Sequence, residues 1–219
     1  MAYDWDWTGA DAAYKRAQEL EPANADVVRG AAALAGTLGR FDEAIRLDRR
    51  AIELDPLRIS PYNNLGNLAY YAGRLEEAEA AFRKALDLNP EYPGAHLLLG
   101  QIYLAQSKPE DALAEMQKEP EPVLRGQGLA LAYHAAGKKK EADAELTEYI
   151  KEFQNAAVFQ IAEIYAYRGE ADKAFEWLER AYKQRDGGLS QMKGDPLLRN
   201  VEKDPRYRPF LQKMKLPID

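Results

Sequence analysis

Two histidines are the first residues to consider for catalysis, because imidazole titrates near neutral pH and often acts as a general base. His96 lies in the apolar run "AHLLLG", and His134 follows "LALAY". The sequence contains no cysteine for either to activate and no serine in a recognisable nucleophile motif. We therefore expect His96 to pack in a core and His134 to lie on a surface, neither with a catalytic role.

Clusters of carboxylates and lysines are the other side chains that could do chemistry. "EEAEA" and "EADAEL" place acidic groups at helical spacing, which is typical of a solvated face. Lys138, Lys139 and Lys140 fall in a turn, where we expect contact with solvent. We find no metal-ligand spacing and no glycine loop for phosphate. The sequence thus predicts no enzyme, no cofactor and no metal.

Composition narrows the class of protein further. The 219 residues carry a net charge of −6, which disfavours a nucleic-acid reader with its usual basic face. Without cysteine there is no disulfide or thiolate site. The apolar runs fall far short of the roughly 20 residues of a membrane helix, and the start lacks a secretion signal. These features predict a cytoplasmic protein with no membrane partner.

A period of 34 residues organises the chain. Pro22, Pro56 and Pro90 end the similar stretches "QELEP", "IELDP" and "LDLNP" at this spacing. "GRFDEAIRLDRRAIELDP" and "GRLEEAEAAFRKALDLNP" align without a gap, and this places Asp48 where the next unit has Phe82. Such a repeat predicts one supersecondary unit stacked several times.

Each unit reads as two amphipathic helices. Leu65, Leu68 and Ala69 share one face of the first helix, and Gly73 ends it in the left-handed conformation that glycine adopts cheaply. Apolar residues at steps of four and three follow in the second helix, and proline stops it. Each helix thus has a stripe of apolar residues along one face. One hairpin cannot bury the stripes of both its helices alone, so we expect stacked neighbours to bury them jointly.

This pattern resembles the tetratricopeptide repeat (TPR) family over nearly the whole chain. The resemblance implies an all-α fold, a right-handed TPR superhelix (α-solenoid) of antiparallel helix hairpins. The best copy, residues 61–90, has the signature residues Tyr62, Leu65, Gly66, Ala69, Ala78, Phe82, Ala85 and Pro90. Further copies carry Leu129, Ala130, Tyr133, Gly137, Ala142 and Leu146, and then Ile161, Ala162, Tyr165, Gly169, Ala174, Leu178 and Ala181.

The register divides the chain into four parts. Residues 1–22 form a half repeat with only its second helix, 23–121 hold repeats with a truncated last unit, 122–185 hold two more, and 186–219 form a capping segment. The early stop at "KEPEP" predicts a kink or hinge near residues 118–123.

Two Asp-Pro pairs predict short helices in the capping segment, at Asp195 and Asp204. We expect both helices to cover the last repeat, with apolar residues Leu197 and Leu198 on the first and Tyr207, Phe210, Leu211 and Met214 on the second. The segment resembles tails in bacterial multidomain regulators and adenylate-cyclase-like proteins, which implies a docking segment of such a protein.

Aromatic residues at the start raise a separate question. Tyr3, Trp5 and Trp7 precede the half repeat. They are expected to fold over the apolar stripe that a missing first helix leaves open, to mark where upstream sequence continued, or to form a homodimer contact.

The resemblance also implies a site, since TPR proteins line an inner concave surface with their first helices. We therefore predict a non-catalytic protein–protein interaction scaffold that binds a peptide or partner segment in this groove. The alternatives are a regulatory part of a larger enzyme or signalling protein, or a self-association module. The groove residues implied are Asn63, Asn67, Tyr70, Tyr71, Leu97, Gln101, Leu104, Gln127, His134, Phe159, Glu163 and Tyr167, with Arg29, Ala33 and Thr37 upstream.

Some TPR domains of cochaperones clamp a C-terminal carboxylate with basic residues and asparagines. Arg29 and Asn64 match two of those places. Ala33, Gly94 and Leu98 stand where an asparagine and two basic residues are needed. The clamp is incomplete, so we expect no binding of that kind.

Overall fold

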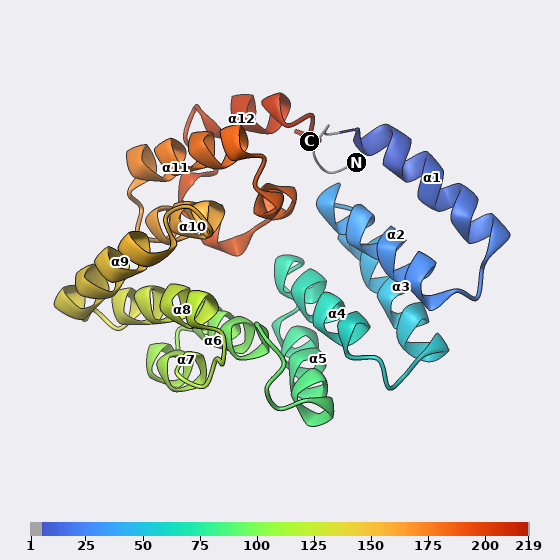
Figure 1. The fold of residues 1–219 in the computed structure, drawn as a ribbon, viewed down its shortest axis with the longest axis horizontal. Coiled ribbons are helices and arrows are strands. Elements are labelled where there is room, and N and C mark those ends of the chain that lie inside the picture. The colour runs from blue at the N-terminus through green and yellow to red at the C-terminus, as the bar shows by residue number, and fades with distance from the viewer. Residues whose placement is uncertain (1–5, 219) are drawn as a thin grey trace. The chain divides into compact units, whose positions relative to one another are not determined.

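Helices and turns make up the computed structural model, which describes residues 6–218 (Figure 1). Within that range we find no strand, and the expected all-α fold of antiparallel hairpins is confirmed. The helices are α1 Trp7–Leu20, α2 Ala25–Thr37, α3 Phe41–Leu54, α4 Ile59–Tyr71, α5 Leu75–Leu88, α6 Ala95–Ala105, α7 Pro109–Met116, α8 Pro122–Ala135, α9 Lys139–Phe153, α10 Val158–Tyr167, α11 Ala171–Gln184 and α12 Tyr207–Lys213, with 3₁₀ turns at Gly187–Gln191 and Pro196–Val201.

The chain forms two compact units. The first unit contains α1 to α5 together with residues 190–196 and 202–218. The second unit contains residues 89–189, with α6 to α11, and residues 197–201. The boundary between the units thus follows α5 at Leu88, whereas the sequence indicated a break near residues 118–123.

A left-handed residue makes the sharp turn inside each hairpin. Gly39, Gly73, Gly137 and Gly169 all have φ between +70° and +76°. In the α6/α7 hairpin Ser107 takes this place with φ of +60°. A side chain is unfavourable in this conformation, so glycine at the other turns has a conformational reason.

Complementary residue sizes hold the two helices of a hairpin together. A Cβ atom on Gly66 would lie 2.7 Å from the ring of Phe82, which shows how closely that ring covers the glycine. Gly100 is covered by Met116 in the same way, at 2.5 Å. Two other hairpins have alanine followed sixteen residues later by leucine, namely Ala130/Leu146 and Ala162/Leu178, and all four of these residues are buried. Close packing therefore needs a small residue opposite each large one.

Asp48 interrupts this rule in the α2/α3 hairpin. It stands sixteen residues after Ala32, and both side chains are completely buried. Its Oδ2 atom accepts a hydrogen bond of 2.5 Å from Nδ2 of Asn64 on α4, whereas its Oδ1 atom has no partner in the described structure. Burial raises the pKa of Asp48 to about 8, against smaller opposing effects of the bond from Asn64 and the charge of Arg29. The carboxyl group is therefore largely neutral at pH 7.

The turn between α7 and α8 is firmly tied within the second unit, so the hinge expected near residues 118–123 is not what the structure shows. Glu119 is 1% exposed, and its carboxylate accepts hydrogen bonds from the backbone N–H groups of Gly94 (3.0 Å) and Leu97 (3.3 Å) at the start of α6. Arg125 donates to the Glu119 carbonyl at 2.7 Å. An acidic group is favourable at a helix N-terminus, so the Glu119 carboxylate stabilises the start of α6. Glu119 lies in the stretch where the sequence pattern of the repeat stops early.

The capping segment divides between the units. Leu197, Leu198 and Val201 are buried in the second unit, as expected for a cover of the last repeat. The expectation for α12 is wrong, because α12 belongs to the first unit. There Trp7 is buried and its Nε1 atom donates to the Met214 carbonyl at 3.0 Å.

The bond from Trp7 to Met214 shows what one of the three N-terminal aromatic residues packs against. The C-terminal segment contacts the buried indole of Trp7 through this bond. Trp7 is therefore not an exposed residue available for a dimer contact in this structure. Tyr3 and Trp5 lie outside the described residues.

We predict that Glu119→Ala lowers the free energy of unfolding by about 1–3 kcal/mol, because buried N–H groups lose a charged acceptor. Urea denaturation of the whole chain measures this, and hydrogen exchange at the amides of Gly94 and Leu97 should accelerate. Glu121 is exposed in the same turn, and Glu121→Ala is the control, with an expected change within about 0.5 kcal/mol. Equal effects of the two substitutions would show that the Glu119 contacts do not stabilise the turn.

We also predict that Asp48→Leu stabilises the protein by about 1–3 kcal/mol at pH 7, since a buried, half-satisfied carboxyl group is replaced by an apolar side chain. Leucine is the residue that pairs with alanine in the α8/α9 and α10/α11 hairpins. The midpoint of urea unfolding should rise with an unchanged slope. A lower midpoint would mean that the carboxyl group contributes more than its burial costs.

The advantage of Asp48→Leu should depend on pH. The folded chain keeps the Asp48 proton up to a pKa of about 8, whereas the unfolded carboxyl group releases it near 3.8. Asp48 therefore makes the free energy of unfolding fall as pH rises from about 4 to about 8. The difference between variant and wild type should grow across this window and level off above it. A constant difference would contradict the raised pKa.

Candidate functional site

The twelve groove residues predicted from sequence fall into two groups of six. The half-buried group keeps surface that a partner can contact: Asn63, Asn67 and Tyr71 in the first unit, and Leu104, His134 and Tyr167 in the second. The other six are at most 7% exposed and offer a partner almost no surface: Tyr70, Leu97, Gln101, Gln127, Phe159 and Glu163.

Packing within each unit explains the buried group. Leu97 packs with Met116 and Ala132 in the core of the second unit. Gln127 and Glu163 satisfy one another, since Nε2 of Gln127 donates to the Glu163 carboxylate at 2.7 Å. These positions of the first helices hold the stack together instead of facing solvent.

The segment after α11 covers Phe159. The backbone N–H of Phe159 donates to the Asp186 carboxylate at 3.2 Å, and a Cβ atom on Gly188 would lie 2.7 Å from the Phe159 ring. Leu189, in the 3₁₀ turn that follows, is completely buried. Part of the expected groove is therefore occupied by the chain itself.

Three of the half-buried residues meet in one open hollow of the second unit, which we name the His134 hollow. It is lined by Leu104, Ser107, Pro109, His134, Ala135, Tyr167 and Asn200. The rings of His134 and Tyr167 meet edge to face, with centroids 6.0 Å apart. Asn200 donates from Nδ2 to the Tyr167 carbonyl at 2.7 Å, and this bond holds the two lining residues together. The ends of α6, α8 and α10 thus contribute one residue each from the predicted set.

Electrostatics favours a neutral imidazole in this hollow. Partial burial and the positive charge of Arg168 lower the pKa of His134, against the opposite effects of Glu170 and Asp143. The neutral ring has one donor and one acceptor nitrogen, so it can hydrogen-bond either a carbonyl or an N–H group.

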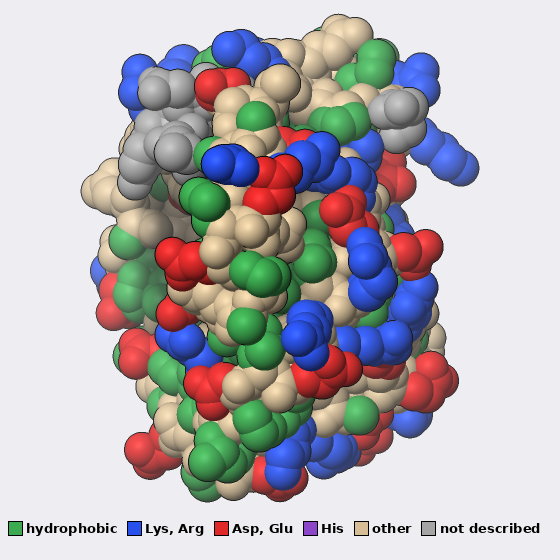
Figure 2. All heavy atoms as spheres, turned by 90° about the vertical axis from the view of Figure 1, so that its right-hand side faces the viewer, with side chains coloured by type: hydrophobic (Ala, Val, Ile, Leu, Met, Phe, Trp, Pro, Cys, Tyr) green, Lys and Arg blue, Asp and Glu red, His purple; other side chains and the backbone are tan. Residues whose placement is uncertain are grey.

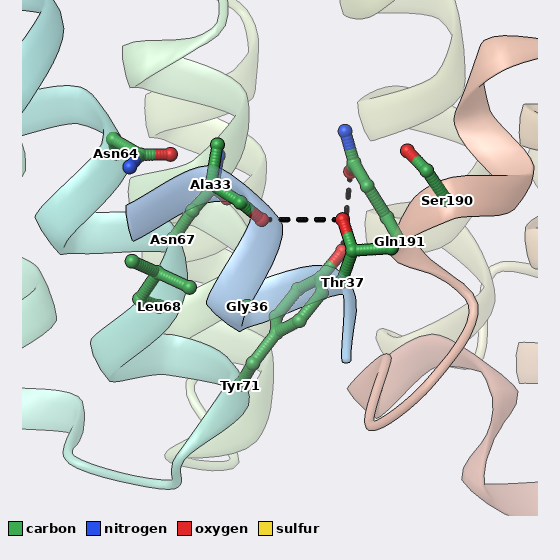
Figure 3. A pocket seen from close by; sticks show the side chains of 9 residues that line it. All are labelled: Ala33, Gly36, Thr37, Asn64, Asn67, Leu68, Tyr71, Ser190 and Gln191. Carbon is green, nitrogen blue, oxygen red and sulfur yellow. Dashed lines mark hydrogen bonds between the residues drawn. The ribbon is translucent and has the colours of Figure 1, made fainter. Parts of the chain in front are cut away.

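A second hollow lies in the first unit and is named the Asn64 pocket (Figure 3). Side chains of α2 and α4 form its walls, and residues of the segment after α11 close one side. It has a volume of about 130 Å³. The lining residues are Ala33, Gly36, Thr37, Asn64, Asn67, Leu68, Tyr71, Ser190 and Gln191.

Sequence reasoning did not foresee the roles of Asn64, Asp48 and Gln191 around this pocket. Asp48 did leave a signal, because an acidic residue occupied an apolar place of the repeat. Gln191 left none, since its place in the wall of the pocket depends on the course of the whole capping segment. The structure brings Asn67 and Tyr71 together here but not Asn63, which does not line the pocket.

Three properties concern the class of partner: the charge on the surface, the grouping of possible metal ligands, and the length and apolar character of the helices. Figure 2 shows acidic and basic side chains interspersed over the face that it presents. In residues 6–218 we find no group of three or more His, Asp and Glu side chains that could hold a metal ion. Of the helices in that range, none combines the length and apolar character needed to cross a membrane.

Comparison with protein families gives two matches to models described as tetratricopeptide repeat, over residues 23–91 and 63–122. They cover α2 to α7, while the later hairpins are recognised from their register and their structure. No match was found among curated proteins.

Solved structures of TPR proteins share the fold. TTC0263, a thermophilic TPR protein of Thermus thermophilus, superimposes with a TM-score of 0.62 at 19% identity, covering 82% of this chain and 90% of its own. The pilus biogenesis factor PilW gives 0.61 at 23% identity, with coverage of 86% and 90%. YrrB, described as a TPR protein with an unusual peptide-binding site, gives 0.51 at 22% identity, with coverage of 83% and 97%.

The 34-residue repeat of the sequence, the helix hairpins of the structure and these matches all indicate the same family. TPR folds serve in general as scaffolds for protein–protein interaction, and the chain belongs to the tetratricopeptide repeat family.

Proposed function

We propose that this protein binds an extended peptide segment of a partner protein at the His134 hollow of the second unit. One observation carries the proposal: residues predicted from three successive first helices meet in the same open hollow. Its volume of about 500 Å³ is within the range of ligand sites. A peptide can enter it without unfolding a helix, since the hollow is open to solvent in the free protein.

The lining residues suggest how a peptide is held. Leu104 and the ring of Tyr167 offer apolar surface for one side chain of the ligand, and aromatic residues often anchor such contacts. His134, as a neutral ring, can hydrogen-bond the peptide backbone between them. Apolar contact would supply affinity and the imidazole would fix the direction of the chain.

One structurally similar TPR protein supports the same proposal. YrrB is described as having a peptide-binding site, and its fold resembles this chain. At 22% identity the likeness concerns the fold, so the place of the site is argued from the hollow.

We predict that Tyr167→Ala weakens peptide binding at least about tenfold, because the ligand loses its aromatic contact. The probe is a twelve-residue peptide selected from a phage-displayed library on the whole wild-type chain, labelled for fluorescence anisotropy. Tyr182→Ala is the control, since Tyr182 lies on α11 and does not line the hollow.

His134→Phe should retain the apolar contact but lose hydrogen bonding, and so weaken binding less than Tyr167→Ala. Circular dichroism should confirm that all three variants remain helical. If the library yields no peptide, or if its peptides bind the Tyr167 and Tyr182 variants equally well, the His134 hollow is not the binding site.

A further inference from the structure

We infer that the Asn64 pocket of the first unit is a second binding site, selective for a primary carboxamide group. The inference stands on the first unit alone and does not depend on the peptide proposed for the second. Four features carry it: the small size of the pocket, the fixed direction of the Asn64 side chain, the donors opposite it, and the absence of charge in its lining.

The pocket has a size suited to one small group. It has a volume of about 130 Å³, close to the roughly 150 Å³ of an engineered protein cavity that binds benzene. Leu68, Ala33 and Gly36 give it an apolar base, and Ser190 and Gln191 close one side. A side chain or a small molecule fits this space, whereas a folded segment does not.

Asp48 sets the direction of the Asn64 carboxamide. Nδ2 of Asn64 donates at 2.5 Å to the buried Asp48 carboxyl group, which is not part of the pocket lining. The Oδ1 atom of Asn64 remains available as an acceptor, and Figure 3 shows it on the side of Ala33. Asp48 thus acts as a positioning residue, and Asn64 is the residue that would touch the ligand.

Donors lie on the other side of the pocket. The Tyr71 hydroxyl donates to Oε1 of Gln191 at 3.3 Å, which leaves Nε2 of Gln191 as a donor (Figure 3). The Asn67 side chain lines the pocket and has no hydrogen-bond partner among residues 6–218. The pocket therefore presents one oriented acceptor and at least one donor.

The ligand class follows from these groups. None of the nine lining side chains is charged, so a carboxylate or an ammonium group would lose its hydration without compensation. A primary carboxamide is neutral, donates through its NH₂ group and accepts through its oxygen. It can donate to Oδ1 of Asn64 and accept from Gln191 or Asn67.

The burial of Asp48 gives a second reason to expect a role. Leucine would fill its place in the stripe at lower cost, as it does in two other hairpins. Asp48 stabilises one orientation of the Asn64 amide, which leucine cannot do. A costly group that orients a pocket residue is typical of a functional site.

A carboxamide can come from a free small molecule or from a Gln side chain of a peptide, and three probes separate these sources. Propionamide represents the free molecule, N-acetylglutamine N-methylamide represents the side chain, and N,N-dimethylpropionamide lacks the NH₂ donors. Each is titrated into the ¹⁵N-labelled whole chain, and the amide signals of Asn64, Asn67 and Gln191 are followed by NMR.

We expect saturable shifts with a primary carboxamide and at least about tenfold weaker binding of the dimethyl compound, since one hydrogen bond to Asn64 is lost. Similar affinities of propionamide and the glutamine derivative identify the free group as sufficient. Binding of the glutamine derivative alone identifies a peptide side chain. Failure of all three probes to bind, or equal binding of the dimethyl compound, overturns the inference.

Variants of Asp48 test its positioning role. Asp48→Leu should weaken carboxamide binding about tenfold although it stabilises the fold, because the Asn64 amide is free to rotate. Asp48→Asn can still present an oxygen to Nδ2 of Asn64 and should bind within about threefold of wild type. If Asp48→Leu binds as well as wild type, Asp48 does not orient the site. Leu198→Ala, in the core of the second unit, controls for general loss of stability.

Discussion

Everything in this chain depends on burial between helices that cannot stay folded alone. In every hairpin from α4/α5 to α10/α11 a small residue in the first helix has a large one sixteen places later, as Gly66 has Phe82. The pairing explains why the helices approach closely and why glycine or alanine recurs at the first place. It also explains why the bulky ring of Phe82 lies opposite glycine whereas leucine lies opposite alanine, since a residue larger than leucine would collide with the alanine Cβ atom.

The same constraint decides how much inner surface remains for a partner. Each unit needs cover for the apolar residues that its own hairpins leave open, and the segment after α11 supplies it. This segment buries Leu189 and Leu198 in the second unit, and Met192 in the first. The hollows that remain lie beside this cover, so residues 190–191 and Asn200 form part of their walls.

Local sequence rules predict most of the fold and only part of the candidate sites. The helices, their glycine turns and the stripe residues follow from short-range spacing, and the structure has them in place. The capping segment does not follow, because nothing within residues 190–214 indicates that α12 joins the first unit. The same holds for Gln127 and Glu163, 36 residues apart, whose mutual hydrogen bond removes both from the predicted groove.

Asp48 shows how a departure from a repeat can be interpreted physically. Asp48 lowers the stability of the fold because its carboxyl group is buried at an apolar position of α3. The same burial raises its pKa and keeps the carboxyl group largely neutral at pH 7. A neutral carboxyl group still has a carbonyl oxygen that can accept the bond from Asn64, so protonation does not release the Asn64 amide. The unpartnered Oδ1 atom is then the natural place for the proton, since it accepts no hydrogen bond from the described residues. The cost in the core and the fixed amide in the pocket are thus two effects of one substitution in the repeat.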